Sequence, residues 1–120
     1  MNDETALLAL SALAQPTRLA VFRLLIHAGG KGVAAGEIAE RVGARPNTLS
    51  THLQALCAGT LIGRERVGRS IVYSANYDRV SDLLTYLLQD CCAGEAEICG
   101  PVIRAVASYS PAPEPSVGAS

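Results

Sequence analysis

The sequence predicts a mainly α-helical domain that carries one β-hairpin, and three observations support this fold class. Leucines recur at helical spacing near both ends of residues 7–88. Two short helical segments meet at a tight turn around Gly43, and two β-branched runs meet at Gly68. With 120 residues, 49% of them hydrophobic, the chain is long enough to bury one core as one domain.

The first two helices are predicted from apolar spacing and from the proline between them. The first helix carries the leucines at 7, 8, 10 and 13 and ends at Gln15, while Pro16 suits the first turn of the second helix. The second helix ends at Gly29 and Gly30, where glycine adopts a positive φ at little cost. Its apolar stripe consists of Leu19, Phe22, Leu25 and Ile26.

The third and fourth helices are predicted to form a helix-turn-helix. Ile38 and Val42 share one face of a short third helix that ends at Gly43, and the fourth helix begins near Pro46. A glycine-containing connection of three residues between two short helices is typical of this motif.

A hairpin and a fifth helix are expected to complete the domain. The runs 61–67 and 70–75 predict two strands that join at Gly68 and Arg69. Leucines and valine at helical spacing predict a helix from Tyr77 to Cys92, which Gly94 would end. Residues 106–120 are rich in proline and serine, and we expect them to be disordered.

The charge distribution indicates an anion-facing surface in the middle of the chain. The net charge is −1, but residues 41–79 hold six arginines and two acidic residues, giving +4, whereas residues 80–120 sum to −4. A solvated face would also explain clustered arginines, so the charge alone does not decide between the two interpretations.

The fourth helix adds a polar surface to this basic segment. Leu49, Leu53 and Leu56 share one face, which we expect in the core, and the opposite face offers uncharged hydrogen-bonding side chains. Such a helix fits the DNA major groove, and arginines of the hairpin, which include Arg64, would lie on phosphates or in the minor groove. The predicted DNA-binding residues are Arg45, Asn47, Thr48, Ser50, Thr51, His52, Gln54, Arg66 and Arg69. His52 lies at the edge of the leucine face, so packing and DNA contact are both open to it.

Three stretches together resemble the ArsR/SmtB family of bacterial metal-responsive repressors. They are ALSALAQPTRLAVFRLL, EIAERVGARPNTLSTHLQALCAGTLI and GRERVGRSIVYSA, and the similarity covers residues 5 to about 90. The resemblance implies a winged helix-turn-helix homodimer that binds an inverted repeat of double-stranded operator DNA, with Ser50, Thr51 and His52 at positions that touch DNA. In such a dimer the first and fifth helices would pair, burying Leu83 and Leu87 against Leu7, Leu10 and Leu13. The step from Cys57 to Leu61 is longer than the family usually has.

The C-terminal cysteines predict the ligand. Cys91, Cys92 and Cys99 fall within nine residues, and an unbroken helix would separate the last two by ~10.5 Å. Gly94 and the Gly100–Pro101 pair allow the segment to fold back, so three thiolates can converge, a donor set that suits trivalent arsenic or antimony as inducer. The segment is similar to ArsR members with a three-cysteine arsenic site at the end of the fifth helix.

Other interpretations of these cysteines stay open. Two of them could hold a methylated trivalent arsenic species, a Cys92–Cys99 disulfide could sense oxidants, or the thiols could be packing residues like the isolated Cys57. The acidic surroundings at a helix C-terminus do not favour a reactive thiolate, which counts against redox sensing.

The remaining expectations concern organisation and location. We expect residues 1–92 to bind DNA and dimerise, 93–105 to bind the metalloid and 106–120 to form the tail. The N-terminus lacks the pattern of a secretion signal and no apolar run is long enough to span a membrane, so we expect a cytoplasmic protein. No nucleophile–base pair or phosphate loop occurs, which argues against an enzyme, and no organic cofactor is expected.

Overall fold

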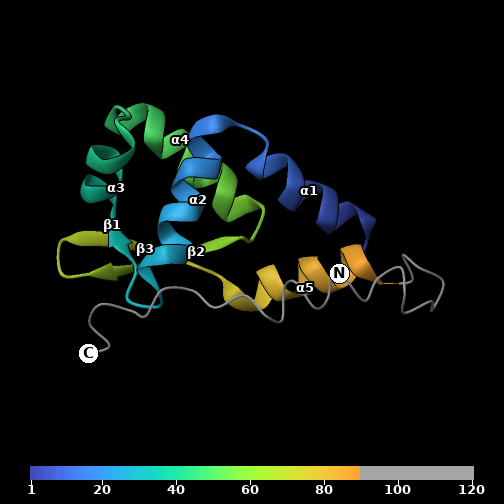
Figure 1. The fold of residues 1–120 in the computed structure, drawn as a ribbon. Coiled ribbons are helices and arrows are strands. Elements are labelled where there is room, and N and C mark those ends of the chain that lie inside the picture. The colour runs from blue at the N-terminus through green and yellow to red at the C-terminus, as the bar shows by residue number, and fades with distance from the viewer. Residues whose placement is uncertain (90–120) are drawn as a thin grey trace. The chain divides into compact units, whose positions relative to one another are not determined.

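A computed structural model describes residues 1–89, which form five helices and a small antiparallel sheet (Figure 1). The elements are α1 (Asp3–Leu13), α2 (Pro16–Ala28), β1 (Val33–Ala34), α3 (Ala35–Val42), α4 (Pro46–Ala58), β2 (Ile62–Val67), β3 (Ser70–Ala75) and α5 (Tyr77–Leu88). The chain divides into two units, Met1–Tyr86 and Leu87–Ser120. The predicted segments 93–105 and 106–120 lie outside the described residues.

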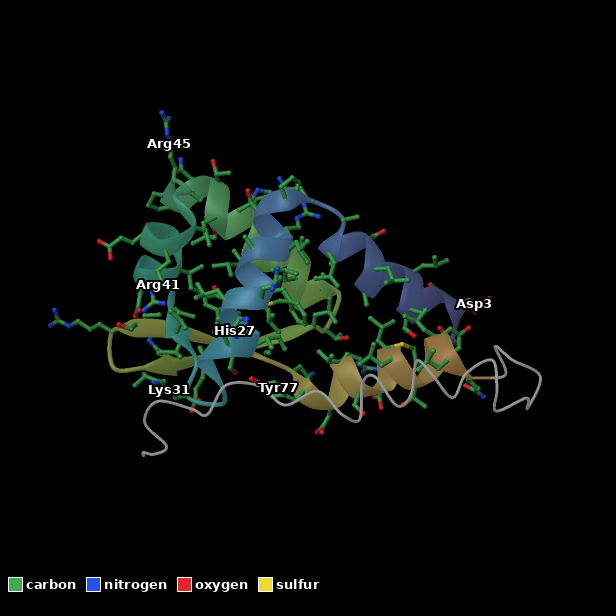
Figure 2. The ribbon with its side chains drawn as sticks, in the orientation of Figure 1. Asp3, His27, Lys31, Arg41, Arg45 and Tyr77 are labelled. Atoms are coloured by element: carbon green, nitrogen blue, oxygen red, sulfur yellow. The ribbon has the colours of Figure 1, made fainter. Side chains whose placement is uncertain are left out.

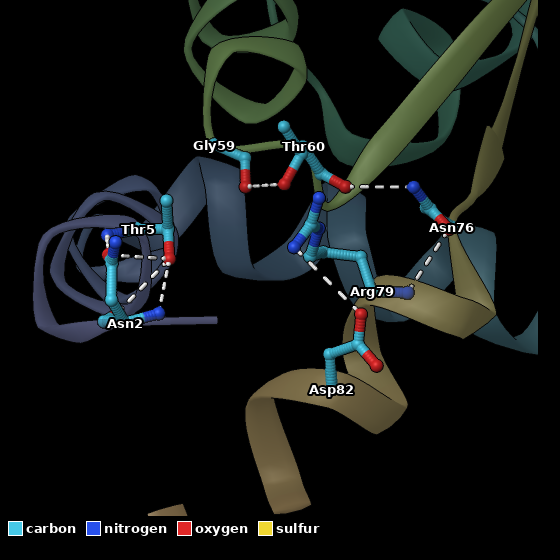
Figure 3. A network of polar contacts seen from close by, with 7 residues as sticks. All are labelled: Asn2, Thr5, Gly59, Thr60, Asn76, Arg79 and Asp82. Carbon is cyan, nitrogen blue, oxygen red and sulfur yellow. Dashed lines mark hydrogen bonds and ion pairs between the residues drawn. The ribbon is translucent and has the colours of Figure 1, made fainter. Parts of the chain in front are cut away.

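The first helices begin at side-chain caps. The Asn2 Oδ1 accepts a hydrogen bond of 2.9 Å from the Thr5 backbone N–H, and the Thr5 Oγ1 accepts one of 3.0 Å from the Asn2 N–H (Figure 3). This reciprocal pair satisfies two donors at the start of α1. At the start of α2 the Gln15 Oε1 accepts from the Arg18 N–H, and Pro16 occupies the first turn as predicted.

The helix α1 turns its small side chains inward. Ala6, Ala9 and Ala12 are buried, whereas Leu7 is 64% exposed and the neighbouring Leu8 is 50% exposed. The end of α4 comes close to this alanine face, because a Cβ on Gly59 would lie 3.0 Å from the Ala12 Cβ. Small residues on both sides therefore let the two backbones approach closely.

The burial of some leucines differs from what the sequence predicts, both on α2 and on α5. In α2, Val21 and Leu25 are fully buried, while Leu19 of the predicted stripe is 46% exposed. Leu83 of α5 is 5% exposed within the single chain, and Leu13 packs against the core. Leu83 therefore belongs to the core of one chain, which corrects its predicted place in the contact between two chains, while Leu13 is only half-buried.

The sheet has the strand order β1–β3–β2, and β1 was not predicted. Two residues give no periodicity that a sequence could reveal. The strand β1 pairs with β3 at Val33↔Tyr73 and Ala34↔Val72. Gly32 precedes it with φ of +73°, and a Cβ there would lie 2.5 Å from the Tyr73 carbonyl oxygen, so glycine is required for this approach.

The turn from α4 to β2 contains the longer step noted between Cys57 and Leu61. Thr60 adopts φ of 63°, the left-handed conformation that is uncommon for a non-glycine residue. Its carbonyl oxygen accepts a hydrogen bond of 3.2 Å from the Asn76 Nδ2 (Figure 3). The Leu61 N–H donates to the Leu56 carbonyl. The turn absorbs the extra length, and β2 begins at Ile62, paired with Ala75.

The start of α5 is tied to two other elements. The Asn76 Oδ1 accepts from the Arg79 N–H at 3.2 Å, so one side chain caps α5 and holds the α4–β2 turn (Figure 3). The Tyr77 hydroxyl donates to the Ile26 carbonyl oxygen at 2.9 Å, near the end of α2. The helix is described to Leu88, and its predicted continuation to Cys92 lies outside the described part of the chain.

No single helix in residues 1–89 has the length and apolar character needed to cross a membrane. Only α1 and α2 taken together reach that length and composition within these residues, and they are bent by 99° where they meet.

Candidate nucleic-acid interface

The helix α4 has the two faces that the sequence predicts. Leu49 and Leu53 are each 2% exposed and Leu56 is fully buried, so all three lie in the core. The opposite face is exposed and uncharged, and its side chains offer hydroxyl and amide groups. The exposed residues of this face, which we call the polar face, are Asn47, Thr48, Ser50, Thr51 and Gln54. Such groups can donate to and accept from base edges or phosphates.

Arg45 extends the polar face at the N-terminus of α4. It occupies the cap position without a side-chain capping bond, is exposed, and points away from the helices (Figure 2). The preceding arginine, Arg41, is paired instead with Glu37 of its own helix, at 3.1 Å between Nη2 and Oε2. Both members of that pair are largely exposed, so the ion pair stabilises the fold little.

His52 is the one predicted DNA contact that is half-buried. Its Nδ1 accepts a hydrogen bond of 3.1 Å from the Nε of Arg18, which lies on α2. The two interpretations left open for His52, packing and contact, are therefore compatible, because one ring nitrogen is bound within the protein.

The wing is the hairpin of β2 and β3. The strands pair from Ile62↔Ala75 to Val67↔Ser70, and Gly68 turns the chain with φ of 63° beside Arg69. The hairpin and its join at Gly68 and Arg69 are as the sequence predicts, and a positive φ at the first of the two turn residues matches a type II′ turn. The strand β1 pairs only with residues 72 and 73 of β3. The residue pairs nearest the turn, Arg66↔Ile71 and Val67↔Ser70, therefore extend beyond the three-stranded part of the sheet.

Alternation along β2 separates its charges. Arg64 and Arg66 share one face of the strand, whereas Glu65 and Val67 belong to the other, and all four are exposed. The arginine face of the wing thus carries no carboxylate from its own strand. Positive charge in this arrangement suits contact with phosphates.

Cys57, at the end of α4, is a free thiol that packs partly against the core. Burial raises the pKa of the Cys57 thiol, and the charge of Arg64 lowers it in part. A thiol with a raised pKa is protonated at neutral pH and reacts slowly, which agrees with the packing role predicted for it.

The structure does not test the predicted metalloid site. Cys91, Cys92 and Cys99 lie outside the described residues. Within residues 1–89 no three side chains of histidine, cysteine, aspartate or glutamate gather into a group that could hold a metal ion. The three-cysteine site therefore stays a prediction from the sequence.

Arg18, which lies on α2 and contacts this surface only through His52, is a residue that the sequence did not reveal. Its contact with His52 joins residues 34 positions apart in the chain, and it lies in a helix that the sequence assigns only to the core. Neither periodicity nor local spacing reveals a pairing over that distance.

Comparison with known proteins agrees with this architecture. The sequence model for a helix-turn-helix domain matches residues 13–62, which run from the end of α1 to the start of β2. Comparison with curated proteins gives no match.

Several solved structures are similar along most of the chain. NolR from Sinorhizobium fredii is 34% identical, with 81% of this chain and 86% of that one covered and a TM-score of 0.57. The homodimeric winged helix-turn-helix DNA-binding domain of Mb0332 from Mycobacterium bovis, a possible ArsR-family transcriptional regulator, is 27% identical, with coverage of 75% and 89% and a TM-score of 0.59.

A possible transcriptional regulator for arsenical resistance is 22% identical, covers 86% of this chain and 97% of its own, and has a TM-score of 0.59. That identity shows a shared fold alone. The helix-turn-helix match, the wing and the likenesses at higher identity agree with one another, and the chain belongs to the ArsR family of winged helix-turn-helix transcriptional regulators.

Proposed function

We propose that the protein is a repressor that binds double-stranded operator DNA as a homodimer and is released by trivalent arsenic or antimony. The observation that carries the DNA-binding part is the composition of one surface: the uncharged polar face of α4, flanked by Arg45 and by the arginines of the wing. An α-helix fits the major groove, and arginines beside it can hold phosphates or enter the minor groove.

The homodimer is proposed from exposed apolar side chains on α1 and α5. Leu7, Leu8 and Leu10 of α1 are between 37% and 64% exposed, and Leu84 of α5 is 46% exposed. Leucines exposed in such numbers on helix faces are typical of a surface that another chain covers. The related Mb0332 domain is homodimeric, which supports a second copy of this chain as the occupant.

The inducer is proposed from the donor chemistry of the C-terminal cysteines. Three thiolates match the soft, three-coordinate preference of trivalent arsenic and antimony, whereas zinc normally takes four ligands. Cys91, Cys92 and Cys99 are the proposed ligands, and they follow α5 in the sequence. Metalloid binding there would act on the dimer through α5.

Release follows from linkage between the two sites. If arsenic lowers the affinity of the dimer for DNA by some factor, DNA lowers its affinity for arsenic by the same factor. A coupling of about 1–3 kcal/mol, which is common for linked sites, changes DNA affinity by roughly 5–150-fold and suffices for induction.

Charge reversal on the wing tests the DNA-binding proposal. We expect the double variant Arg66→Glu/Arg69→Glu to lose most of its affinity for a duplex selected by the wild type from a randomised pool, measured by fluorescence anisotropy. Arg23→Glu is the matched control, since Arg23 is an exposed arginine on α2 outside the proposed surface. Equal affinity of the wild type and the wing variant would refute the proposal.

A release titration tests the inducer. Wild type and single Cys→Ser variants at 91, 92 and 99 are titrated on DNA with arsenite, methylarsenite, zinc and peroxide, and Cys57→Ser is the control. We expect arsenite to release wild type and Cys57→Ser, but not the three ligand variants. Release by zinc or peroxide alone, or a normal arsenite response without Cys92, would contradict the assignment; a response to methylarsenite that needs only two cysteines would assign the methylated species.

A further inference from the structure

We infer that Arg18 is a positioning residue for DNA recognition, which fixes His52 in the tautomer that presents Nε2–H as a donor. The inference rests on the proposed DNA-binding function of α4 and adds to it a residue outside the helix-turn-helix surface. Its basis is the hydrogen bond of 3.1 Å from the Arg18 Nε to the His52 Nδ1, which joins α2 to α4.

The chemistry of Arg18 and His52 determines which ring nitrogen of His52 carries the proton. A guanidinium has five N–H donors and no acceptor, and it stays protonated at all working pH values. The nitrogen that accepts from it must therefore carry a lone pair, so Nδ1 is unprotonated. A neutral imidazole then holds its single proton on Nε2, and the imidazolium form would place a second N–H against Arg18.

The location of His52 places the Nε2–H where it can donate a hydrogen bond to DNA. His52 follows Ser50 and Thr51 of the polar face and lies between that face and the leucines in the core. A fixed Nε2–H can donate to a phosphate oxygen, to guanine O6 or N7, or to thymine O4, but cannot accept from the amino groups of adenine or cytosine. Arg18 thereby decides which groups of DNA this side chain can recognise.

Arg18 is itself held in place at the start of its helix. Its backbone N–H donates to the Gln15 Oε1 at 2.9 Å, and Pro16 fixes the backbone of the first turn. The contact with His52 is half-buried, which protects it from competing water. Because Arg18 is fixed by these contacts, it restricts the orientation of the His52 ring more than a freely moving, exposed partner would.

Nuclear magnetic resonance tests the positioning without DNA. Long-range correlation spectra of ¹⁵N-labelled protein distinguish protonated from unprotonated ring nitrogens. We expect His52 in the wild type at neutral pH to show an unprotonated Nδ1 and a protonated Nε2, and Arg18→Met to give a mixture of tautomers. The control Arg23→Met, on the same helix, should leave the His52 signals unchanged. A protonated Nδ1 in the wild type, or an unchanged tautomer in Arg18→Met, would overturn the inference.

A double-mutant cycle tests the consequence for DNA. We expect Arg18→Met to lower affinity for the selected duplex about tenfold in the wild type but less than about twofold in the His52→Ala background. Equal losses in both backgrounds would show that Arg18 contacts DNA by itself, and would overturn the positioning role. If the wild type binds no DNA at all, the proposed function fails, while the tautomer measurement still decides the contact between Arg18 and His52.

Discussion

The helices α1 and α4 use apolar side chains in opposite ways. In α4 the leucines are buried and the opposite face is polar, whereas in α1 the alanines are buried and Leu7, Leu8 and Leu10 are exposed. Leucine burial stabilises a fold far more than alanine burial, because more apolar surface leaves water. A helix that exposes its leucines and buries its alanines thus keeps its larger apolar surface for another molecule.

The difference assigns separate roles to the two helices. The exposed surface of α4 consists of hydrogen-bonding groups, which suit a polar ligand such as DNA. The exposed surface of α1 is apolar, which suits a protein partner. Substitutions in the two helices and at the end of α4 should therefore have effects of different kind and size.

Removing a leucine from the buried face of α4 should have the largest effect. Leu56 is fully buried, so Leu56→Ala is expected to lower the free energy of unfolding by about 2–5 kcal/mol, measured by urea denaturation. Leu19→Ala is the control, because Leu19 is 46% exposed and its truncation should cost less than about 0.5 kcal/mol. Similar losses for both variants would contradict the described core.

Placing a charge on the exposed face of α1 should separate the subunits while the fold persists. Leu7 is 64% exposed, and we expect Leu7→Lys to raise the dissociation constant of the dimer by about 100-fold, measured by analytical ultracentrifugation. Circular dichroism should remain that of the wild type. Leu19→Lys provides the same charge on an exposed leucine of α2, and equal dissociation in that control would argue against α1 as the interface.

Asn76 tests how firmly the end of α4 is held. Its side chain binds the Thr60 carbonyl and the Arg79 N–H, so Asn76→Ala should lower the free energy of unfolding by about 1 kcal/mol. The affected turn should also exchange its amide hydrogens faster. Unchanged exchange at Thr60 and Leu61 would show that the turn holds its left-handed residue without this contact.

The pH dependence of Cys57 should be the smallest effect. Burial raises the pKa of the Cys57 thiol and Arg64 lowers it in part, so the unfolded chain ionises this thiol at a lower pH than the folded chain. The free energy of unfolding should therefore fall as the pH rises past the ordinary thiol pKa of about 8.5. Cys57→Ser should weaken this slope between pH 7 and pH 10 in urea titrations; an identical slope would exclude Cys57 as a contributor.

Much of the fold could be predicted because its signals are local. Gly43 and Pro46 mark the turn and the start of α4, and the structure confirms both, with Gly43 in the left-handed conformation. The leucines of α4 share one face, so their burial follows from helical spacing. The hairpin follows from two β-branched runs separated by two residues, one of them glycine.

Other features depend on tertiary contacts that the sequence does not display. The helix α1 is apolar on both sides, so its spacing predicts a helix but not whether alanines or leucines face the core. The strand β1 exists because β3 lies beside it, and Thr60 takes a left-handed conformation because its surroundings hold it there. The Arg18–His52 contact likewise depends on how α2 crosses α4.

The contact between Gly59 and the alanine face of α1 would have a mechanical consequence in the proposed dimer. A Cβ at Gly59 would lie 3.0 Å from the Ala12 Cβ and 3.4 Å from the Leu8 carbonyl oxygen, so almost no side-chain atoms separate α1 from the end of α4. Long side chains absorb a small displacement by changing rotamer, but a glycine and an alanine cannot. In a dimer built on α1, a change in the angle between the subunits would therefore be passed on to the α4 helix of each subunit. It would alter the distance between the two half-sites that the α4 helices can span.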